Sequence, residues 1–318
     1  MPSTSTVHPA PPAPSGQALM PLLAALAAAL LWGGSFSAAK IALATFSPMS
    51  LMWLRMTLAT LLLLPLAHRV LPRNVRRKDL KLLAATCLLM PCGYFLFEAN
   101  ALRLTTSAQA GVISSFVPLL VALGAAMFLG EALTRRVVAG LALSMAGVAW
   151  LSLAGTAGGS GSAPDPLLGN ALEFLAMVCA AGSMLLVKRL SGRYGPWSLT
   201  AMQTMVGAVF FLPGATSVDT APWDWPPEAA LAVLFLGGLV TLGAFGLYNW
   251  ALSRLAAARV SAFINLVPLV AVVFGWLFLE ETLTPFQCLA AVMILSGVAL
   301  SQGRWGMIRL RRYAPEHG

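Results

Sequence analysis

Residues Phe116–Thr134 read FVPLLVALGAAMFLGEALT, and residues Leu266–Thr284 read LVPLVAVVFGWLFLEETLT. In both segments a proline stands near the start of an apolar run, and a glutamate follows thirteen positions later, at Glu131 and Glu281. The two segments lie 150 positions apart. A segment that recurs in this way indicates that the chain contains an internal duplication.

The duplication extends well beyond these two segments. Residues 101–150 align with residues 251–300 without a gap and give 14 identical pairs in 50 positions, where this composition would give about four by chance. Upstream the offset becomes 148, and the matched pairs include Gly34/Gly182, Ser35/Ser183, Lys40/Lys188 and Pro48/Pro196. The two copies together cover almost the whole chain.

The composition is typical of a membrane protein. Of the 318 residues, 58% are hydrophobic and 10% are charged, and the mean hydropathy is +0.81, whereas charged residues make up about 25% of a soluble domain. A membrane-spanning helix needs about 20 mainly apolar residues. Ten segments meet this requirement: 20–43, 48–67, 80–102, 105–130, 136–154, 167–190, 196–215, 228–252, 256–279 and 284–303. We therefore predict an all-α integral membrane protein with ten transmembrane helices.

Lysine and arginine cluster in alternate connections between these segments. The clusters include Arg76, Arg77 and Lys78, then Arg135 and Arg136, then Lys188 and Arg189, and finally Arg311 and Arg312. Because cytoplasmic loops are enriched in these residues, both termini are predicted to be cytoplasmic. The net charge of +9 is explained as an orientation signal, and no basic domain indicates a nucleic-acid partner.

Each copy of the duplicated unit contains five spans, so the second copy enters the membrane from the side opposite to the first. Inverted repeats of this kind are a common construction of secondary transporters, whose central site opens alternately to each side. The predicted organisation is a disordered tail at 1–18, a five-helix repeat at 19–155, a linker at 156–166, a second five-helix repeat at 167–303 and a basic cytoplasmic tail at 304–318.

Several motifs carry a resemblance to a known family. The motifs are WGGSF and Lys40 within Trp32–Lys40, the pattern of Ser47, Pro48 and Arg55, and the doubled AL…P…E-x-L-T segments, which end at Thr134 and Thr284. In this order the sequence resembles the drug/metabolite transporter superfamily, EamA type, from about residue 20 to 303. The resemblance implies a carrier of the bacterial inner membrane, often an exporter of amino acids and other metabolites, with a central cavity built chiefly by the first, third, fourth, sixth, eighth and ninth spans. A multidrug, nucleoside, sugar or cofactor carrier of the same fold remains the alternative.

Four charged residues fall inside predicted spans, where a charge needs a partner, water or a function. They are Lys40, Arg55, Glu98 and Glu173, and all four belong to the outer half of the membrane. Arg55 and Glu98 are predicted either to form a static neutralising pair or to handle substrate or protons. Protons are therefore a candidate coupling ion beside the small-molecule substrate and the lipid bilayer, and the sequence carries no signal for an oligomeric state.

Polar and aromatic residues within the spans are candidates for the wall of the substrate cavity. They are Trp32, Ser35, Tyr94, Glu98, Asn100, Gln203, Tyr248, Asn249 and Asn265. The alternative for each is a hydrogen bond that joins two helices, since polar side chains often serve this purpose in membranes. Pro118 and Pro268 are predicted to kink their helices, with or without a role at the cavity. Glu131 and Glu281 are interpreted as boundary or capping residues.

Signals of catalysis are weak. Ser37 and Lys40 spell S-x-x-K, but the companion motifs of serine acyl-enzymes are missing, and there is no HExxH or Walker A sequence. The four cysteines, Cys87, Cys92, Cys179 and Cys288, lie in apolar runs without metal-binding or disulfide spacing. We therefore expect no enzymatic activity, no metal and no cofactor, with an intramembrane enzyme as a far weaker alternative.

Overall fold

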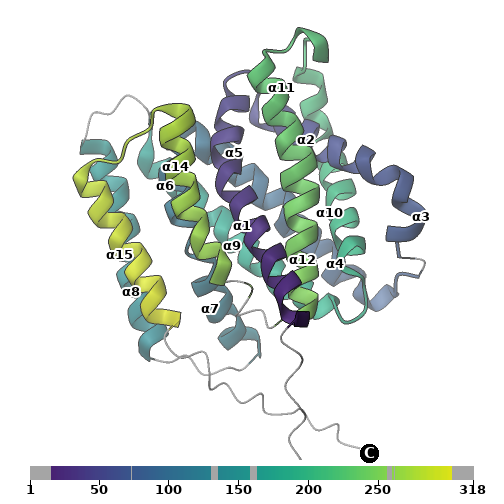
Figure 1. Cartoon of the computed structure of the whole chain (residues 1–318), viewed down its shortest axis with the longest axis horizontal. Helices are drawn as coiled ribbons and strands as arrows, with labels where there is room; N and C mark the ends of the chain where they lie inside the picture. The colour runs from purple at the N-terminus through teal and green to yellow at the C-terminus, as the bar shows by residue number, and fades with distance from the viewer. Residues whose placement is uncertain are drawn as a thin grey trace, which may run out of the picture.

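The structure is a computed structural model, and it describes residues 16–72, 74–129, 135–157, 163–255, 260 and 262–302. Within these ranges the chain forms helices and no strands, and the helices pack side by side as a bundle (Figure 1). Glu131, the basic tail at 304–318 and nearly all of the predicted tail at 1–18 lie outside the described residues.

The helices follow one another along the chain with short connections. Their bounds are α1 Gly16–Leu43, α2 Pro48–Leu63, α3 Ala67–Val70, α4 Leu80–Cys87, α5 Tyr94–Leu104, α6 Ser107–Ser114, α7 Val117–Leu129, α8 Arg135–Ala157, α9 Pro166–Leu190, α10 Pro196–Phe210, α11 Pro227–Leu234, α12 Phe245–Arg254, α14 Val267–Leu279 and α15 Pro285–Gln302. The π-helical segments Leu88–Gly93 and Phe235–Ala244 join α4 to α5 and α11 to α12.

Each of the ten predicted segments overlaps helix in the described part of the chain. Six helical stretches are long and apolar enough to cross a membrane: Leu19–Leu43, Pro48–Val70, Arg77–Leu104, Ser107–Gly124, Pro166–Leu190 and Pro227–Arg254. The apolar stretches Val138–Gly147, Val267–Leu279 and Pro285–Gly297 are shorter. The chain is therefore a multi-pass membrane protein by length and composition of its helices.

Local sequence fixes where several helices begin. The side chains of Ser47, Thr106 and Asp165 accept hydrogen bonds from backbone N–H groups three residues ahead, at 3.2, 3.1 and 3.1 Å. These bonds satisfy N–H groups that have no partner within a helix. Pro48 and Pro166 follow two of these caps directly, at a position where the missing N–H of proline has no cost.

Pro118 and Pro268, which were predicted to kink their helices, lie close to breaks in the helical path. Each is the second residue of its helix, α7 and α14 respectively, and each follows a break in the helical path. Before Pro118 the break lies at Ser115 and Phe116, whose N–H groups donate to carbonyls only three residues back. The prolines therefore begin new helices, because the fixed proline backbone angle suits a first turn and opposes an interior position.

The contact between α8 and α15 is reciprocal with respect to the sequence repeat. A Cβ atom on Gly147 would lie 2.7 Å from Ile294 Cγ1, and one on Gly297 would lie 2.3 Å from Ser144 Oγ. Gly147 and Gly297 are repeat partners at the offset of 150, and so are positions 144 and 294. The glycine of each copy therefore contacts the residue of the other copy that lies three positions before the equivalent glycine. Figure 1 shows α8 and α15 lying side by side.

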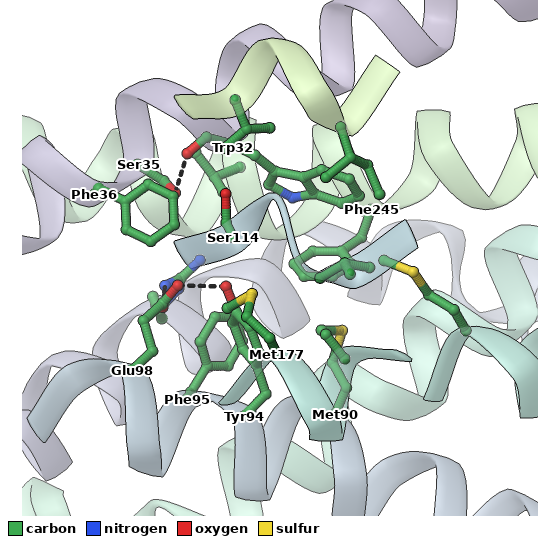
Figure 2. A pocket seen from close by; sticks show the side chains of 17 residues that line it. Trp32, Ser35, Phe36, Met90, Tyr94, Phe95, Glu98, Ser114, Met177 and Phe245 are labelled. Atoms are coloured by element: carbon green, nitrogen blue, oxygen red, sulfur yellow. Dashed lines mark hydrogen bonds and ion pairs between the residues drawn. The ribbon is translucent and has the colours of Figure 1, made fainter. Parts of the chain in front are cut away.

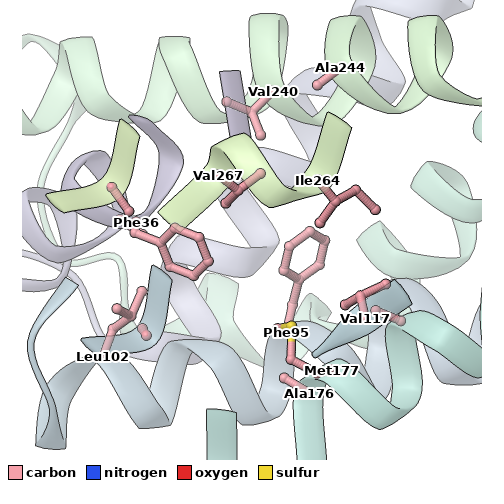
Figure 3. Close-up of a cluster of buried hydrophobic side chains, with 14 of the residues drawn as sticks. Phe36, Phe95, Leu102, Val117, Ala176, Met177, Val240, Ala244, Ile264 and Val267 are labelled. Carbon is pink, nitrogen blue, oxygen red and sulfur yellow. The ribbon is translucent and has the colours of Figure 1, made fainter. Parts of the chain in front are cut away.

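Buried apolar side chains from both copies form one core. Phe36, Phe95 and Leu102 come from the first copy, whereas Met177 and Ile264 come from the second. Figure 3 shows Phe95 lying among residues of α7, α9 and the segment before α14. Dense apolar packing of this kind shields any polar group that it surrounds from water and lipid.

Candidate functional site

A cavity of about 40 Å³ lies at the centre of the bundle, between the two copies of the repeat. The first copy supplies Trp32, Ser35, Arg55, Tyr94 and Glu98, together with Phe36, Met90, Phe95, Ser114 and Val117; the second supplies Met177, Ala180, Met184, Val240, Phe245, Ile264 and Val267. Four of the predicted cavity residues, Trp32, Ser35, Tyr94 and Glu98, therefore line one space. Figure 2 shows the polar groups facing it from opposite sides.

Arg55 and Glu98 form the charged centre of this cavity. Arg55 on α2 is 1% exposed and Glu98 on α5 is 3% exposed. Their closest side-chain atoms, Arg55 Nη1 and Glu98 Oε2, are 3.9 Å apart. The hydroxyl of Tyr94 donates a hydrogen bond to Glu98 Oε1, the contact drawn as a dashed line in Figure 2. Glu98 is therefore held by a cation on one side and by a donor on the other.

Arg55 also reaches the second copy of the repeat. Its Nε donates to Thr241 Oγ1 at 3.0 Å, and its guanidinium carbon lies 4.1 Å from the centre of the Phe95 ring. A planar guanidinium can stack on an aromatic ring and donate sideways at the same time, which a lysine ammonium cannot do. Sequence reasoning did not identify Thr241, because a single threonine in an apolar run carries no distinguishing pattern.

Glu173 on α9 is completely buried, with 0% of its surface exposed. Neither of its carboxyl oxygens has a hydrogen-bond partner in the described part of the chain. Asn170, one turn earlier, joins a separate polar cluster: Thr105 Oγ1 lies 2.7 Å from Asn170 Oδ1 and 2.8 Å from Gln109 Oε1. Glu173 thus differs from the other buried charged residues that were predicted, each of which has a polar partner.

Lys40 does not join Arg55 and Glu98 and instead pairs with Glu281. The Lys40 ammonium lies 2.8 Å from Glu281 Oε1, and the two side chains are 22% and 3% exposed. Ser107 donates to the same carboxylate through its hydroxyl at 2.6 Å and its backbone N–H at 3.1 Å, and the Ala108 N–H donates at 3.2 Å. Glu281, which was interpreted as a boundary or capping residue, therefore caps the N-terminus of α6.

Electrostatics favour the ionised form of Glu281, which lies between α14 and α15 and outside both helices. Burial opposes the charge, but hydrogen bonds from Lys40 and Ser107 outweigh it and hold the pKa of this carboxyl below its usual value. The sequence did contain a signal for this pair, because Lys40 and Lys188 are repeat partners, as are Glu131 and Glu281. A lysine and a glutamate that are both kept in the two copies are candidates for one contact.

The remaining predicted cavity residues lie around the cavity or away from it. Tyr248 packs on Trp32 with ring centres 4.8 Å apart, and Gln203 lines a smaller neighbouring pocket and donates to the Met90 carbonyl at 3.0 Å. Asn249 Nδ2 donates to Thr200 Oγ1 at 2.9 Å, and Asn100 Nδ2 donates to the Leu96 carbonyl of its own helix at 2.7 Å. The side chain of Asn265 lies outside the described residues.

A second and larger cavity lies beside α7 and α9, near the end of α9. It has a volume of about 430 Å³ and is lined by Leu89, Gly124, Gly182, Leu185, Leu186, Lys188 and Arg189. Lys188, the repeat partner of Lys40, is exposed here, and its ammonium donates to the Leu252 carbonyl at 3.0 Å. The two equivalent lysines therefore have different surroundings: Lys40 forms an ion pair with Glu281, and Lys188 lines the second cavity.

Comparison with protein families identifies the two copies. The profile of the EamA-like transporter family matches the chain twice, over residues 19–153 and 167–302. An uncharacterized transporter of Bacillus subtilis (strain 168), YcxC, is 29% identical over 286 residues, which are 87% of this chain and 90% of that protein. A probable terminal-alkyne amino-acid exporter of Streptantibioticus cattleyicolor is 27% identical over 280 residues, with 86% and 90% of the two chains covered.

A solved structure shares the fold of this chain. A crystal structure of a protein with 22% sequence identity superposes with a TM-score of 0.61 and covers 88% of this chain and 96% of the other. At this identity the likeness concerns the fold alone. The two matches of the family profile together span nearly all of the described bundle, including every residue that lines the central cavity.

Proposed function

Because the chain belongs to the EamA-like transporter family, we propose that it is a secondary-active transporter that exports amino acids or related small metabolites by alternating access. The observation that carries this proposal is the central cavity, which is enclosed by both copies of the repeat and contains one cation and one carboxylate. The relative from Streptantibioticus cattleyicolor, a probable exporter of an amino acid, supports the substrate class.

The proposed architecture is an inverted repeat of two five-helix units, at 19–155 and 167–303, joined by a linker at 156–166. The reciprocal contact of Gly147 with Ile294 and of Gly297 with Ser144 supports it, since a two-fold axis exchanges such pairs. The lysine and arginine pattern supports an orientation with both termini in the cytoplasm, and membership of the family supports a location in the bacterial inner membrane.

The two ends of the bundle support a proposal for the state of the transporter in this structure. At the end proposed to face the periplasm, Glu281 contacts both Lys40 and Ser107 and so joins the two copies of the repeat. At the other end, the larger cavity lies beside the exposed Lys188. We assign the structure to a conformation closed to the periplasm, and alternating access then requires the Lys40–Glu281 contact to break when the outer side opens.

Recognition of an amino acid needs partners for two opposite charges. Arg55 can face the substrate carboxylate, because guanidinium groups bind carboxylates in two-pronged geometry. Glu98 can face the ammonium group, and the rings of Trp32, Tyr94 and Phe245 offer an apolar wall for the side chain. A zwitterion brings no net charge into the cavity, which limits the cost of burying it.

The test is transport by the purified protein in proteoliposomes. Melting curves with a panel of amino acids, nucleosides, sugars and cationic drugs select the ligand, because a bound ligand raises the melting temperature. We expect stabilisation by amino acids and counterflow of the same compounds across the vesicle membrane. Stabilisation by nucleosides, sugars or drugs alone would contradict the substrate class, and no transport of any stabilising compound would contradict the transporter itself.

A further inference from the structure

The second cavity lies on a different side of α9 from the central cavity. The second cavity is lined from α9 by residues spaced as one side of a helix, namely Gly182, Leu185, Leu186 and Arg189. The central cavity is lined from α9 by Met177, Ala180 and Met184. At about 100° of rotation per residue, these two sets point in nearly opposite directions from the helix axis. The helix α9 therefore stands between the two cavities.

The side of α9 that carries the second cavity faces the membrane. Val178 and Leu175 lie one and two turns before Gly182 on this side, and they are 42% and 44% exposed. Leu88, the neighbour of Leu89 in the cavity wall, is 58% exposed. Exposed apolar side chains in a helix long enough to span the membrane contact the hydrocarbon chains of lipids. A lipid molecule can therefore reach the second cavity from the side.

The wall of this cavity combines an apolar part with a cationic end. Its apolar part consists of three leucines and two glycines, whereas Lys188 and Arg189 are exposed cations in the last turn of α9. No acidic side chain is among the described residues that line it. The volume of about 430 Å³ lies within the range of about 300–1,000 Å³ that is usual for ligand sites. The cavity thus matches a molecule with an apolar chain and an anionic head.

Both cations can still bind an anion. Arg189 forms no ion pair and no hydrogen bond with a described residue. The Lys188 ammonium donates to the Leu252 carbonyl at 3.0 Å, and its other two N–H groups have no acceptor in the described part of the chain. Cations at the end of a span also serve as an orientation signal. That signal explains the charges, but it does not explain an apolar cavity beside them.

We propose that the second cavity binds an anionic phospholipid, with an acyl chain in the apolar part and the phosphate group against Lys188 and Arg189. Anionic headgroups attract cations at the membrane surface, and a guanidinium group can hold a phosphate through two parallel hydrogen bonds. Leu89 and Gly124 belong to the first copy of the repeat, so the lipid contacts both copies. This site goes beyond the proposed function, because it does not depend on the compound that is transported.

The first test measures the affinity and the selectivity for lipids. Purified protein in a neutral detergent is titrated with phosphatidylglycerol, and the bound lipids are counted by native mass spectrometry. Phosphatidylcholine offers the same chains without net charge, and glycerol 3-phosphate offers the headgroup without chains. We expect phosphatidylglycerol to bind at least tenfold more tightly than phosphatidylcholine and to resist competition by glycerol 3-phosphate. Equal binding of the two lipids, or full competition by glycerol 3-phosphate, would overturn the proposal.

Variants of the two cations locate the headgroup. Lys188→Gln and Arg189→Gln should each weaken binding of phosphatidylglycerol about 5-fold, and the double variant about 30-fold, if each cation contributes as is usual near an anionic surface. Lys188→Arg keeps the charge and should keep the affinity. The matched control is the double variant Lys78→Gln, Lys81→Gln, which removes two exposed cations that do not line the cavity. An equal loss of affinity in both double variants would show diffuse attraction and contradict a defined site.

Photo-crosslinking locates the acyl chain. The probe is phosphatidylglycerol with a photoreactive group at the end of one chain, and the labelled peptides are identified by mass spectrometry. We expect label at Leu89 and Leu186 or their direct neighbours, and an excess of plain phosphatidylglycerol should remove it. Leu186→Trp fills the cavity without changing its charge and should lower this label at least several-fold.

Label that is spread evenly along the exposed side of α9, including Leu175, would overturn the proposal, as would label that Leu186→Trp leaves unchanged. If Leu186→Trp does not fold, the wild type still decides. Label at Leu89 and Leu186 that phosphatidylglycerol removes and phosphatidylcholine does not remove would support the site, and label removed equally by both lipids would contradict it. None of these measurements requires a transported compound, so the lipid site and the proposed function can fail separately.

Discussion

The ammonium group of Lys40 lies 2.8 Å from Glu281 Oε1, although 241 residues separate them in the sequence. Lys40 belongs to the end of α1 in the first copy, and Glu281 follows α14 in the second. The same carboxylate accepts three hydrogen bonds from Ser107 and Ala108 at the start of α6. One side chain therefore ties three elements together at one end of the bundle, where the two copies meet.

Replacement of this carboxylate should destabilise the protein. In Glu281→Gln the charge that faces Lys40 is lost, and the hydrogen bonds at the start of α6 become weaker. We expect the free energy of unfolding in detergent to fall by about 2–4 kcal/mol, measured by chemical denaturation. Glu280→Gln is the control, because the neighbouring glutamate is exposed. An equal loss in both variants would show that the contact of Glu281 with Lys40 and Ser107 has no special weight.

The same group should give the protein an acid-sensitive component of stability. The pKa of Glu281 is lowered in the folded state, so its stabilisation is complete above the pKa of the unfolded chain, about 4.3 for glutamate. That stabilisation is lost as the pH falls through the lower pKa of the folded state. The difference in melting temperature between wild type and Glu281→Gln should therefore be constant near neutral pH and vanish in strong acid. A difference that persists there would contradict the assigned ionisation.

Sequence patterns were informative wherever they were local or repeated. Apolar segments of about 20 residues indicated where helices lie, and the recurrence of Pro118 and Glu131 at Pro268 and Glu281 indicated the duplication. They could not show that Pro118 and Pro268 begin helices, because a membrane helix tolerates proline both inside and at its first turn. Only the break at Ser115 and Phe116 in the structure distinguishes the two cases.

The sequence indicated which charged residues belong to the candidate site, but it did not indicate which of them contact one another. Arg55 and Glu98 stood out because charges inside a membrane span are rare. The pairing of Lys40 with Glu281 and the lack of a hydrogen-bond partner for Glu173 among the described residues depend on helix packing across the two copies, which leaves no local pattern. Glu281 lay in a connecting segment, where a charged residue is ordinary, and so its burial at 6% exposure was not predicted.

Arg55 and Glu98 should be coupled in stability. Glu98→Gln leaves a buried guanidinium opposite a neutral group, and we expect a loss of about 3 kcal/mol in the free energy of unfolding. The double variant Arg55→Gln, Glu98→Gln removes both charges and should recover at least half of that loss. Melting and denaturation curves of the two single variants and the double variant give the coupling. If the losses in the free energy of unfolding of the two single variants simply added in the double variant, the 3.9 Å contact between Arg55 and Glu98 would not contribute to stability.

The proposed orientation predicts the side on which each connection lies. Reporter fusions after Arg77 and after Arg312 should report the cytoplasm, because lysine and arginine mark that side. A fusion near Gly159, between the two copies, should report the periplasm, since an odd number of spans precedes it. An odd number of predicted spans separates Arg77 from Gly159. If the two fusions reported the same side, the number of spans between them would be even, and the inverted repeat would be wrong.

The interface between α6 and α14 offers a test by exchange of a single methyl group. A Cβ atom on Gly111 would lie 2.2 Å from Ala271 Cβ, so Gly111→Ala forces the two helices apart or strains them. We expect a loss of about 1–3 kcal/mol in the free energy of unfolding, although alanine alone would favour the helix by up to about 1 kcal/mol over glycine.

Adding Ala271→Gly moves the methyl group from one helix to the other and should restore most of the stability. Gly192→Ala is the control, since nothing lies within 4 Å of the added carbon. Because α6 and α14 belong to different copies, transport should fall and recover with the same variants. A Gly111→Ala protein of unchanged stability would mean that the helices are not packed this closely.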